Sequence, residues 1–220
     1  MTDRRSRYVV VEGPIGVGKT SLARRLAEHY GSDLVLEQAE ENPFLERFYR
    51  DPRRFALPTQ LFFLFQRVRQ LQDMRQDDLF APVRVADFLI EKDALFAELT
   101  LDADELALYR QTYEHLARDL AGNVPQPDLV IYLQAPVDVL VARVRKRGIP
   151  HEQLIEPAYL ERLADSYARF FHHYHASPLL IVNAKDINPI EREADFRQLL
   201  RAVENTRSGR HYFNPVPDFA

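Results

Sequence analysis

The sequence contains no cysteine and no tryptophan among its 220 residues. Without cysteine, the chain has no disulfide, no thiolate nucleophile and no zinc site built on cysteine ligands. No apolar run approaches the roughly 20 residues that a membrane-spanning helix needs. The start of the chain, residues 1–7, is charged and lacks the apolar segment of a secretory signal. These absences predict a cytoplasmic protein that does not enter a membrane.

The sequence also lacks an excess of basic residues. Its formal net charge is -4 and its pI is near 6.0, whereas non-specific binding to nucleic acid usually needs a basic surface. We therefore expect no nucleic-acid partner. The length fits one domain with a full core, which we place at residues 1–206. A loose tail, 207–220, would follow, with Phe213 and Phe219 as the side chains able to dock on the body.

Five short apolar or β-branched runs have the composition of buried strands, and helical stretches separate them. This alternation favours an α/β fold, in which helices cover both faces of a five-stranded parallel sheet. The expected strands are 8–12, 34–36, 83–87, 128–133 and 179–183. The expected helices are 19–30, 58–76, 102–121, 136–147, 159–176 and 189–203.

The pattern G-x-x-x-x-G-K-[ST] lies between the first expected strand and the first expected helix, which is the context that a phosphate-binding loop requires. Its glycines allow backbone N–H groups to surround phosphate oxygens, and the helix N-terminus adds a partial positive charge. Lys19 can reach the outer phosphates of ATP, and Thr20 can offer its hydroxyl to Mg²⁺. The loop alone does not separate a kinase from a GTPase or an ATPase. Its residues are Gly13, Pro14, Ile15, Gly16, Val17, Gly18, Lys19 and Thr20.

Two carboxylates follow expected strands, Glu37 after the second and Asp87 at the end of the third. Ligands of an open parallel sheet bind beyond the carboxyl ends of its strands. Glu37 is therefore a candidate general base that accepts a proton from an attacking hydroxyl. Asp87 is a candidate Mg²⁺ ligand, directly or through water. The alternative for both is a solvated carboxylate at a strand end.

Four cations, Arg143, Arg145, Lys146 and Arg147, crowd the end of one expected helix. Basic residues there also suit the helix dipole, so a solvated helix end is one interpretation. The other is a lid whose arginines neutralise charge on a transferring phosphoryl group.

From residue 8 to about 186, these motifs and their order resemble the deoxynucleoside kinase family. The resemblance implies a P-loop kinase fold with an arginine-bearing lid, ATP and Mg²⁺, and a homodimer formed through helices such as 58–76 and 102–121. It implies that Glu37 is the general base, and that Lys19, Arg143 and Arg147 stabilise charge. It implies further that Tyr49 and Glu152 contact the sugar 3′-hydroxyl, that Gln60, Arg67 and Asp93 read the base, and that Lys185 and Asp186 belong to the loop around the adenine of ATP.

The chain departs from the family pattern at two places. After the third strand, the family's acidic-Arg-Ser motif is Asp87-Phe88-Leu89, so the arginine is missing, and Lys92 is a candidate to supply its charge. A third lid arginine is replaced by Ile149.

The favoured hypothesis is an enzyme of nucleotide salvage that phosphorylates the 5′-hydroxyl of a deoxynucleoside. Arg67 and Asp93 would crowd the methyl group of thymine, which favours deoxyadenosine or deoxyguanosine, with deoxycytidine as the remaining alternative. A nucleoside-monophosphate kinase such as thymidylate kinase would share the loop and the lid. A non-catalytic nucleotide switch would share the loop alone.

Overall fold

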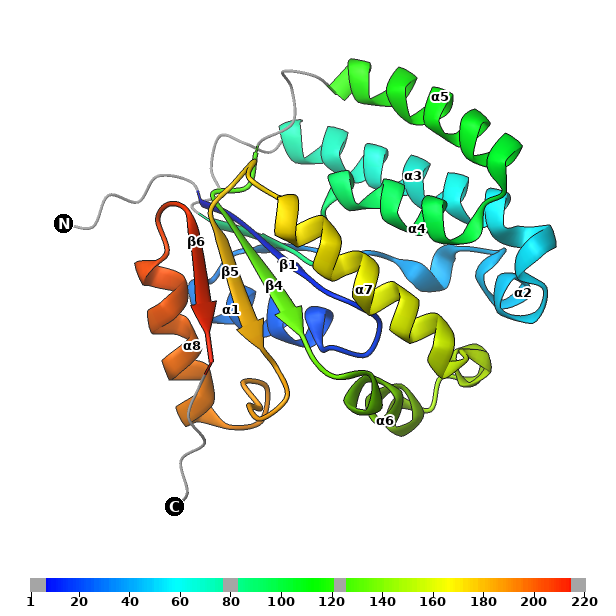
Figure 1. Cartoon of the computed structure of the whole chain (residues 1–220). Coiled ribbons are helices and arrows are strands. Elements are labelled where there is room, and N and C mark those ends of the chain that lie inside the picture. The colour runs from blue at the N-terminus through cyan, green and yellow to red at the C-terminus, as the bar shows by residue number, and fades with distance from the viewer. Residues whose placement is uncertain (1–6, 77–82, 121–125, 215–220) are drawn as a thin grey trace.

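The computed structural model describes residues 7–76, 83–120 and 126–214. Its centre is a parallel sheet of six strands in the order β2-β3-β1-β4-β5-β6, with helices on both sides (Figure 1). The α/β prediction is therefore confirmed. The strands are β1 (Arg7–Glu12), β2 (Asp33–Val35), β3 (Val83–Ala86), β4 (Leu129–Gln134), β5 (Leu179–Asn183) and β6 (Arg210–Phe213).

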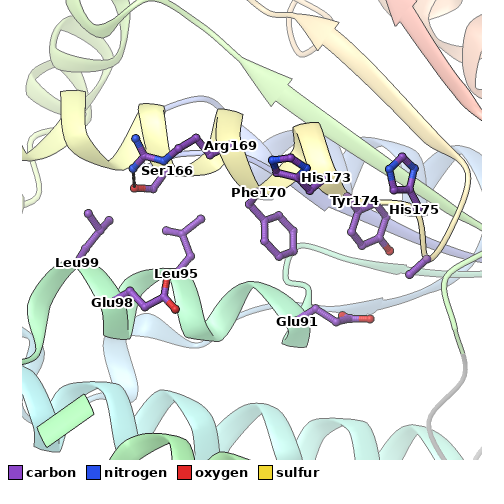
Figure 2. A pocket seen from close by; sticks show the side chains of 11 residues that line it. Glu91, Leu95, Glu98, Leu99, Ser166, Arg169, Phe170, His173, Tyr174 and His175 are labelled. Atoms are coloured by element: carbon purple, nitrogen blue, oxygen red, sulfur yellow. Dashed lines mark hydrogen bonds between the residues drawn. The ribbon is translucent and has the colours of Figure 1, made fainter. Parts of the chain in front are cut away.

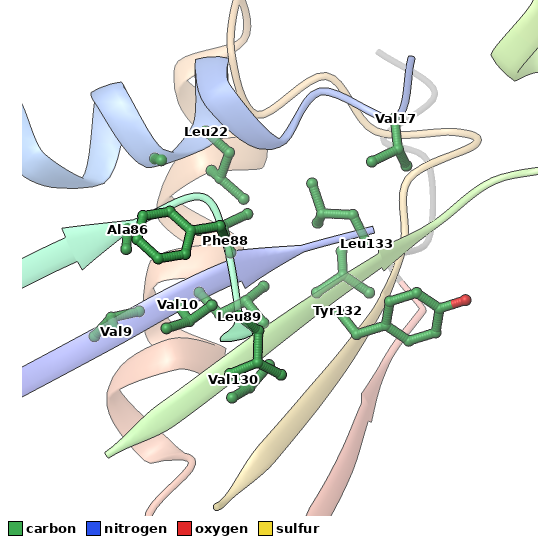
Figure 3. Packing of buried hydrophobic residues seen from close by; sticks show 14 of the residues in the cluster. Val9, Val10, Val17, Leu22, Ala86, Phe88, Leu89, Val130, Tyr132 and Leu133 are labelled. Carbon is green, nitrogen blue, oxygen red and sulfur yellow. The ribbon is translucent and has the colours of Figure 1, made fainter. Parts of the chain in front are cut away.

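The middle of the sheet is apolar because helices cover both of its faces, and strands in such sheets are near-continuous hydrophobic runs. Val9, Val10 and Val11 of β1 are fully buried, as is Val130 of β4. Figure 3 shows Leu22 of α1 above these strands, and Leu89 belongs to the same buried cluster. The parallel register pairs Val10 with Val130 and with Ala86 of β3, so the carboxyl ends of the three strands lie at the same edge of the sheet.

The helices form two layers. Arg25 of α1 lies 4.2 Å from the ring centroid of Phe196 of α8, so these two helices pack side by side. On the other side of the sheet, α7 packs through Tyr167 on Tyr132 of β4, and α3, α4 and α5 lie beyond it (Figure 1). The bounds are α1 (Lys19–Tyr30), α2 (Leu45–Arg50), α3 (Pro52–Gln76), α4 (Asp93–Thr100), α5 (Ala103–Leu120), α6 (Val137–Arg147), α7 (Pro157–His173) and α8 (Glu193–Asn205).

The expected loose tail contains the sixth strand, so the strand count of five was too low. β6 runs parallel to β5, with Arg210 opposite Leu179. The Arg210 guanidinium donates hydrogen bonds to the carbonyls of Phe171 and His172, 3.0 and 2.8 Å away at the end of α7. Phe213 packs against the core as expected, while Phe219 lies outside the described residues. The short polar run of β6 has no apolar alternation that would have predicted it.

Several helix boundaries differ from the predictions, and proline explains two of them. α3 begins at Pro52 and contains Pro58, the expected first residue of this helix. α8 begins at Glu193, not at residue 189, because Pro189 belongs to a turn whose carbonyl accepts a hydrogen bond of 2.7 Å from Arg25. Within the described ranges, no helix is both long and apolar enough to cross a membrane.

Candidate functional site

A cavity of about 910 Å³ opens at the carboxyl ends of β1, β2 and β3. It brings together residues that are far apart in the sequence, from the phosphate loop to the segment after α6. Of the predicted site residues, those that line it are Ile15, Gly16, Gly18, Lys19, Thr20, Glu37, Tyr49, Gln60, Arg67, Asp87, Arg147 and Glu152.

The phosphate loop has a backbone that only glycine accommodates. Gly16 has φ +84°, and a Cβ atom built there would lie 2.9 Å from the carbonyl oxygen of Leu140 and from Val144 Cγ2. Gly13 is tighter, since its Cβ would lie 2.4 Å from the carbonyl oxygen of Leu133. α1 follows directly and its first turn has no side-chain cap. Its N–H groups can therefore bind an anion.

One carboxylate, that of Asp87, joins the phosphate loop to the segment after β2. Its Oδ2 accepts a hydrogen bond of 2.5 Å from the Thr20 hydroxyl, and its Oδ1 accepts one of 2.7 Å from the backbone N–H of Glu37. Burial raises the pKa of Asp87, and these two hydrogen bonds oppose that effect. Carboxylate and hydroxyl oxygens are the ligands that Mg²⁺ prefers. The pair predicted for Mg²⁺, Thr20 and Asp87, therefore has suitable chemistry and lies together.

Arg67 lies between two carboxylates at the floor of the cavity, forming ion pairs with Glu37 and Asp93. Burial alone would raise the pKa of Glu37, but the charges of Arg67, Lys92 and Lys19 hold it at about 2. Burial raises the pKa of Asp93 to about 6, and the Arg67 charge opposes this shift. Asp93 does not line the cavity itself, so it contacts the site through Arg67.

The rim of the cavity joins α2 to the segment after α6. Arg147 forms two hydrogen bonds to Glu152, of 2.9 and 2.7 Å. His151 stacks on Tyr49, with 5.9 Å between ring centroids. Burial raises the pKa of Tyr49, so its hydroxyl remains protonated at neutral pH and can donate a hydrogen bond. Ile149 also lines the cavity and brings no charge to the position of the missing lid arginine.

Arg143 lies apart from the other predicted catalytic residues. Its guanidinium donates to the carbonyl of Val17 at 3.2 Å and to that of Ala184 at 2.8 Å. It lines a neighbouring cavity of about 390 Å³, together with Lys185 and Asp186. The structure therefore groups Arg143 with the residues predicted for adenine and does not bring it to Glu37.

Two residues of the site region were not predicted from the sequence. Glu12, the last residue of β1, is fully buried, and its Oε2 accepts hydrogen bonds from the N–H of Gly13 at 3.0 Å and from the Tyr167 hydroxyl at 3.1 Å. Glu12 could have been identified from its position, since it is an acidic residue at the end of an apolar strand and directly precedes the phosphate loop. Tyr167 has no such signal, because its helix is amphipathic and an aromatic residue on its inner face is ordinary core.

A further cavity of about 690 Å³ lies between α4 and α7. Figure 2 shows Leu95 of α4 and Phe170 of α7 extending into the space between these two helices, and Glu98 and Arg169 also line the cavity. None of the predicted site residues lines it. In the part of the chain that the structure describes, no group of three or more histidine, aspartate or glutamate side chains is placed to hold a metal ion.

The sequence matches the family model described as deoxynucleoside kinase over residues 9–207. It is 39% identical over 162 residues to a deoxyguanosine kinase of Bacillus subtilis (strain 168), covering 73% of this chain and 76% of that protein. It is 30% identical over 208 residues to a deoxyadenosine kinase of Lactobacillus acidophilus, covering 90% of this chain and 95% of that protein.

Solved structures agree with this fold. The structure of deoxyadenosine kinase from M. mycoides with bound dATP superimposes with a TM-score of 0.77, at 22% identity, and the match covers 90% of this chain and 100% of that one. The family match spans most of the sequence, including the phosphate loop, both strand-end carboxylates and the segment after α6. The chain belongs to the deoxynucleoside kinase family.

Proposed function

We propose that this kinase transfers the γ-phosphoryl group of ATP to the 5′-hydroxyl of a purine deoxynucleoside. One observation carries the proposal: a phosphate loop and a strand-end carboxylate, Glu37, line the same cavity, and Asp87 contacts both Thr20 and Glu37. Such an arrangement can place an attacking hydroxyl and a terminal phosphate next to each other.

On the donor side, the backbone of the phosphate loop and Lys19 would bind the triphosphate of ATP. Thr20 and Asp87 would hold Mg²⁺, which would neutralise charge on the phosphate oxygens when bound. The adenine would lie near Lys185 and Asp186, which line the neighbouring cavity with Arg143. Arg143 would then act through the loops that it joins, and Arg147 through its position on the rim of the acceptor cavity.

On the acceptor side, Tyr49 and Glu152 would hold the 3′-hydroxyl, and Gln60 and Arg67 would face the base, with Asp93 fixing Arg67. The names of the relatives favour purines, since they include deoxyguanosine and deoxyadenosine kinases. A relative of Bacillus subtilis (strain 168) at 27% identity is a deoxyadenosine/deoxycytidine kinase, which keeps deoxycytidine as the alternative.

In the transfer step, the 5′-oxygen forms a bond to the γ-phosphorus as the bond to the bridging oxygen of ADP breaks. The proton of the 5′-hydroxyl passes to Glu37. A carboxylate whose pKa is near 2 is fully ionised at neutral pH, so it is ready to accept a hydrogen bond from the acceptor. Phosphoryl transfer through a loose transition state depends mainly on positioning and charge, so a weak base is sufficient.

The test is kcat/KM for the four deoxynucleosides with ATP and Mg²⁺. We expect deoxyadenosine or deoxyguanosine to give the highest value. A preference for thymidine would contradict the roles of Gln60, Arg67 and Asp93 in base recognition.

The two other hypotheses make different predictions. A nucleoside-monophosphate kinase would phosphorylate a deoxynucleoside monophosphate and would keep near-normal turnover in Glu37→Gln, because its acceptor needs no general base. A non-catalytic switch would bind a nucleotide tightly and phosphorylate none of these acceptors.

We also propose a homodimer in the cytoplasm, with no membrane or nucleic-acid partner. The suggested interface through α3 and α5 is supported by two large apolar side chains exposed on these helices, Phe65 at 44% and Leu108 at 51%. Sedimentation equilibrium tests this proposal. We expect a dimer mass for the wild type and a shift toward the monomer in Phe65→Asp/Leu108→Asp.

A further inference from the structure

A buried lysine lies beside the phosphate loop without a role in the mechanism above. Lys92 ends the short helix at Ile90–Lys92 and is 1% exposed. It lines the same cavity as Lys19, Glu37 and Asp87. Its charge lowers the pKa of Glu37 and also that of Lys19, so the ammonium acts on both sides of the site.

The partner of Lys92 is Glu12, which lies directly before the phosphate loop. The Lys92 Nζ is 3.2 Å from Glu12 Oε1, and the same oxygen accepts a hydrogen bond of 2.8 Å from the N–H of Leu89. The other Glu12 oxygen is bound by Gly13 and Tyr167. Three hydrogen bonds and one ion pair therefore hold the Glu12 carboxylate in place. An uncompensated carboxylate at this place would repel the phosphates, so the lysine neutralises a charge that the loop cannot tolerate.

Neutralising Glu12 does not use the whole ammonium group. The lysine ammonium has three N–H donors, and among the described residues the only carboxylate in an ion pair with the Lys92 ammonium is Glu12. The Nζ also lies 5.1 Å from the ring centroid of Phe96, a weaker attraction. At least one donor is therefore available to an anion in the cavity that Lys92 lines.

Two other cations of the cavity lining are already held in ion pairs with carboxylates. Arg67 is shared between Glu37 and Asp93. Arg147 is paired with Glu152. The acids that line the cavity are Glu37, Glu40, Asp87 and Glu152, and the cations are Lys19, Arg24, Arg67, Lys92 and Arg147. Charge that develops on a transferring phosphoryl group is stabilised by positive charge next to the phosphate loop, which Lys92 can supply.

We propose that Lys92 is a catalytic residue that donates to the transferring phosphoryl group, and that Glu12 is the positioning residue that holds its ammonium in place. This proposal rests on the proposed function. In this proposal, the segment after β3 supplies a positive charge to the site through Lys92, which ends the short helix before α4.

The test compares Lys92→Met, Lys92→Arg and the double variant Glu12→Gln/Lys92→Met. We expect Lys92→Met to lower kcat by about 100-fold or more, with the KM for the deoxynucleoside changed by less than about threefold, because the contact forms in the transition state. Lys92→Arg should recover at least about tenfold of this loss. Arg110→Met, which breaks an exposed ion pair with Glu98 of α4, is the matched control and should leave kcat unchanged.

The double variant separates catalysis from charge balance. It removes both charges of the buried pair, so it should unfold near the wild-type temperature even where Lys92→Met is unstable. We expect its kcat to remain as low as that of Lys92→Met. Recovery of kcat to within about threefold of the wild type would show that Lys92 only neutralises Glu12, and would overturn the proposal.

The test of Lys92 can fail or succeed independently of the proposed function. If the wild type phosphorylates no deoxynucleoside, the proposed function fails, and the slow hydrolysis of ATP by water becomes the readout. Lys92→Met should lower this hydrolysis as well. Equal hydrolysis in Lys92→Met and the wild type would overturn the role of Lys92 whatever the acceptor is.

Discussion

The donor and acceptor halves of the site are built in different ways. The donor half is one continuous stretch of backbone, residues 13–20, whose shape depends on glycines with no room for a side chain. The acceptor half is a set of side chains from α2, α3 and α4, held by ion pairs such as Arg67 with Glu37 and Asp93. One half should therefore be sensitive to a single methyl group, and the other to a single charge.

The largest expected effect tests the acceptor half. Glu37→Gln should lower kcat by about 10²- to 10⁴-fold, the usual contribution of a general base, while ADP binding stays within about threefold of the wild type. Steady-state kinetics and calorimetric titration with ADP measure the two quantities. Glu46→Gln, which removes an exposed acid of α2, is the control and should change neither.

The ion pairs of the acceptor half should also support the fold. Arg67→Met leaves the buried Asp93 and the partly buried Glu37 without their cation, and breaking a buried pair costs about 3–5 kcal/mol of unfolding free energy. Urea denaturation measures this cost. Arg50→Met breaks an exposed pair with Glu46, which is worth only about 0–1 kcal/mol. Equal destabilisation by the two changes would mean that the buried pairs contribute no more than a surface pair.

A single methyl group should damage the donor half. Gly16→Ala places a Cβ 2.9 Å from the Leu140 carbonyl in a left-handed backbone, a strain of about 1–3 kcal/mol, so affinity for ATP should fall by about 5- to 150-fold. Gly31→Ala has a similar backbone, φ +58°, but its Cβ would meet nothing within 4 Å. It serves as the control and should bind ATP normally. Equal losses of ATP affinity in Gly16→Ala and Gly31→Ala would show that the donor half does not depend on the missing side chain at Gly16.

The smallest expected effect concerns pH. The pKa of Glu37 in the folded protein is about 2, below its ordinary value of 4.5. Its ionised form therefore stabilises the fold fully above the ordinary pKa, and this contribution is lost as the pH falls toward 2. The difference in unfolding free energy between wild type and Glu37→Gln should be constant from about pH 7 to 5 and should narrow by about pH 3. A constant difference throughout would contradict the depressed pKa.

The same contrast explains what could be predicted from the sequence. The loop between β1 and α1 could be predicted because its pattern is local and its backbone shape requires glycine. The strand-end carboxylates followed from the expected sheet, and the side chains of α3 from the family resemblance. The ion pair of Glu12 and Lys92 could not be predicted from the sequence, since only the folded sheet brings Glu12 Oε1, at the end of β1, to 3.2 Å from Lys92 Nζ, after β3. Arg143 was grouped with Arg147 because one helix carries both, whereas the structure turns them toward different cavities.

The sixth strand has a consequence for the solubility of the chain. β6 hydrogen-bonds to β5, whose Leu179, Leu180 and Val182 are buried. Removing residues from Gly209 onward would leave an apolar strand as a bare sheet edge, with unpaired N–H and C=O groups that invite pairing with another molecule. By pairing with β5, β6 and its polar residues Arg210 and His211 cover this edge, and we expect them to protect the enzyme from aggregation. A truncated chain should retain its phosphate loop and yet precipitate.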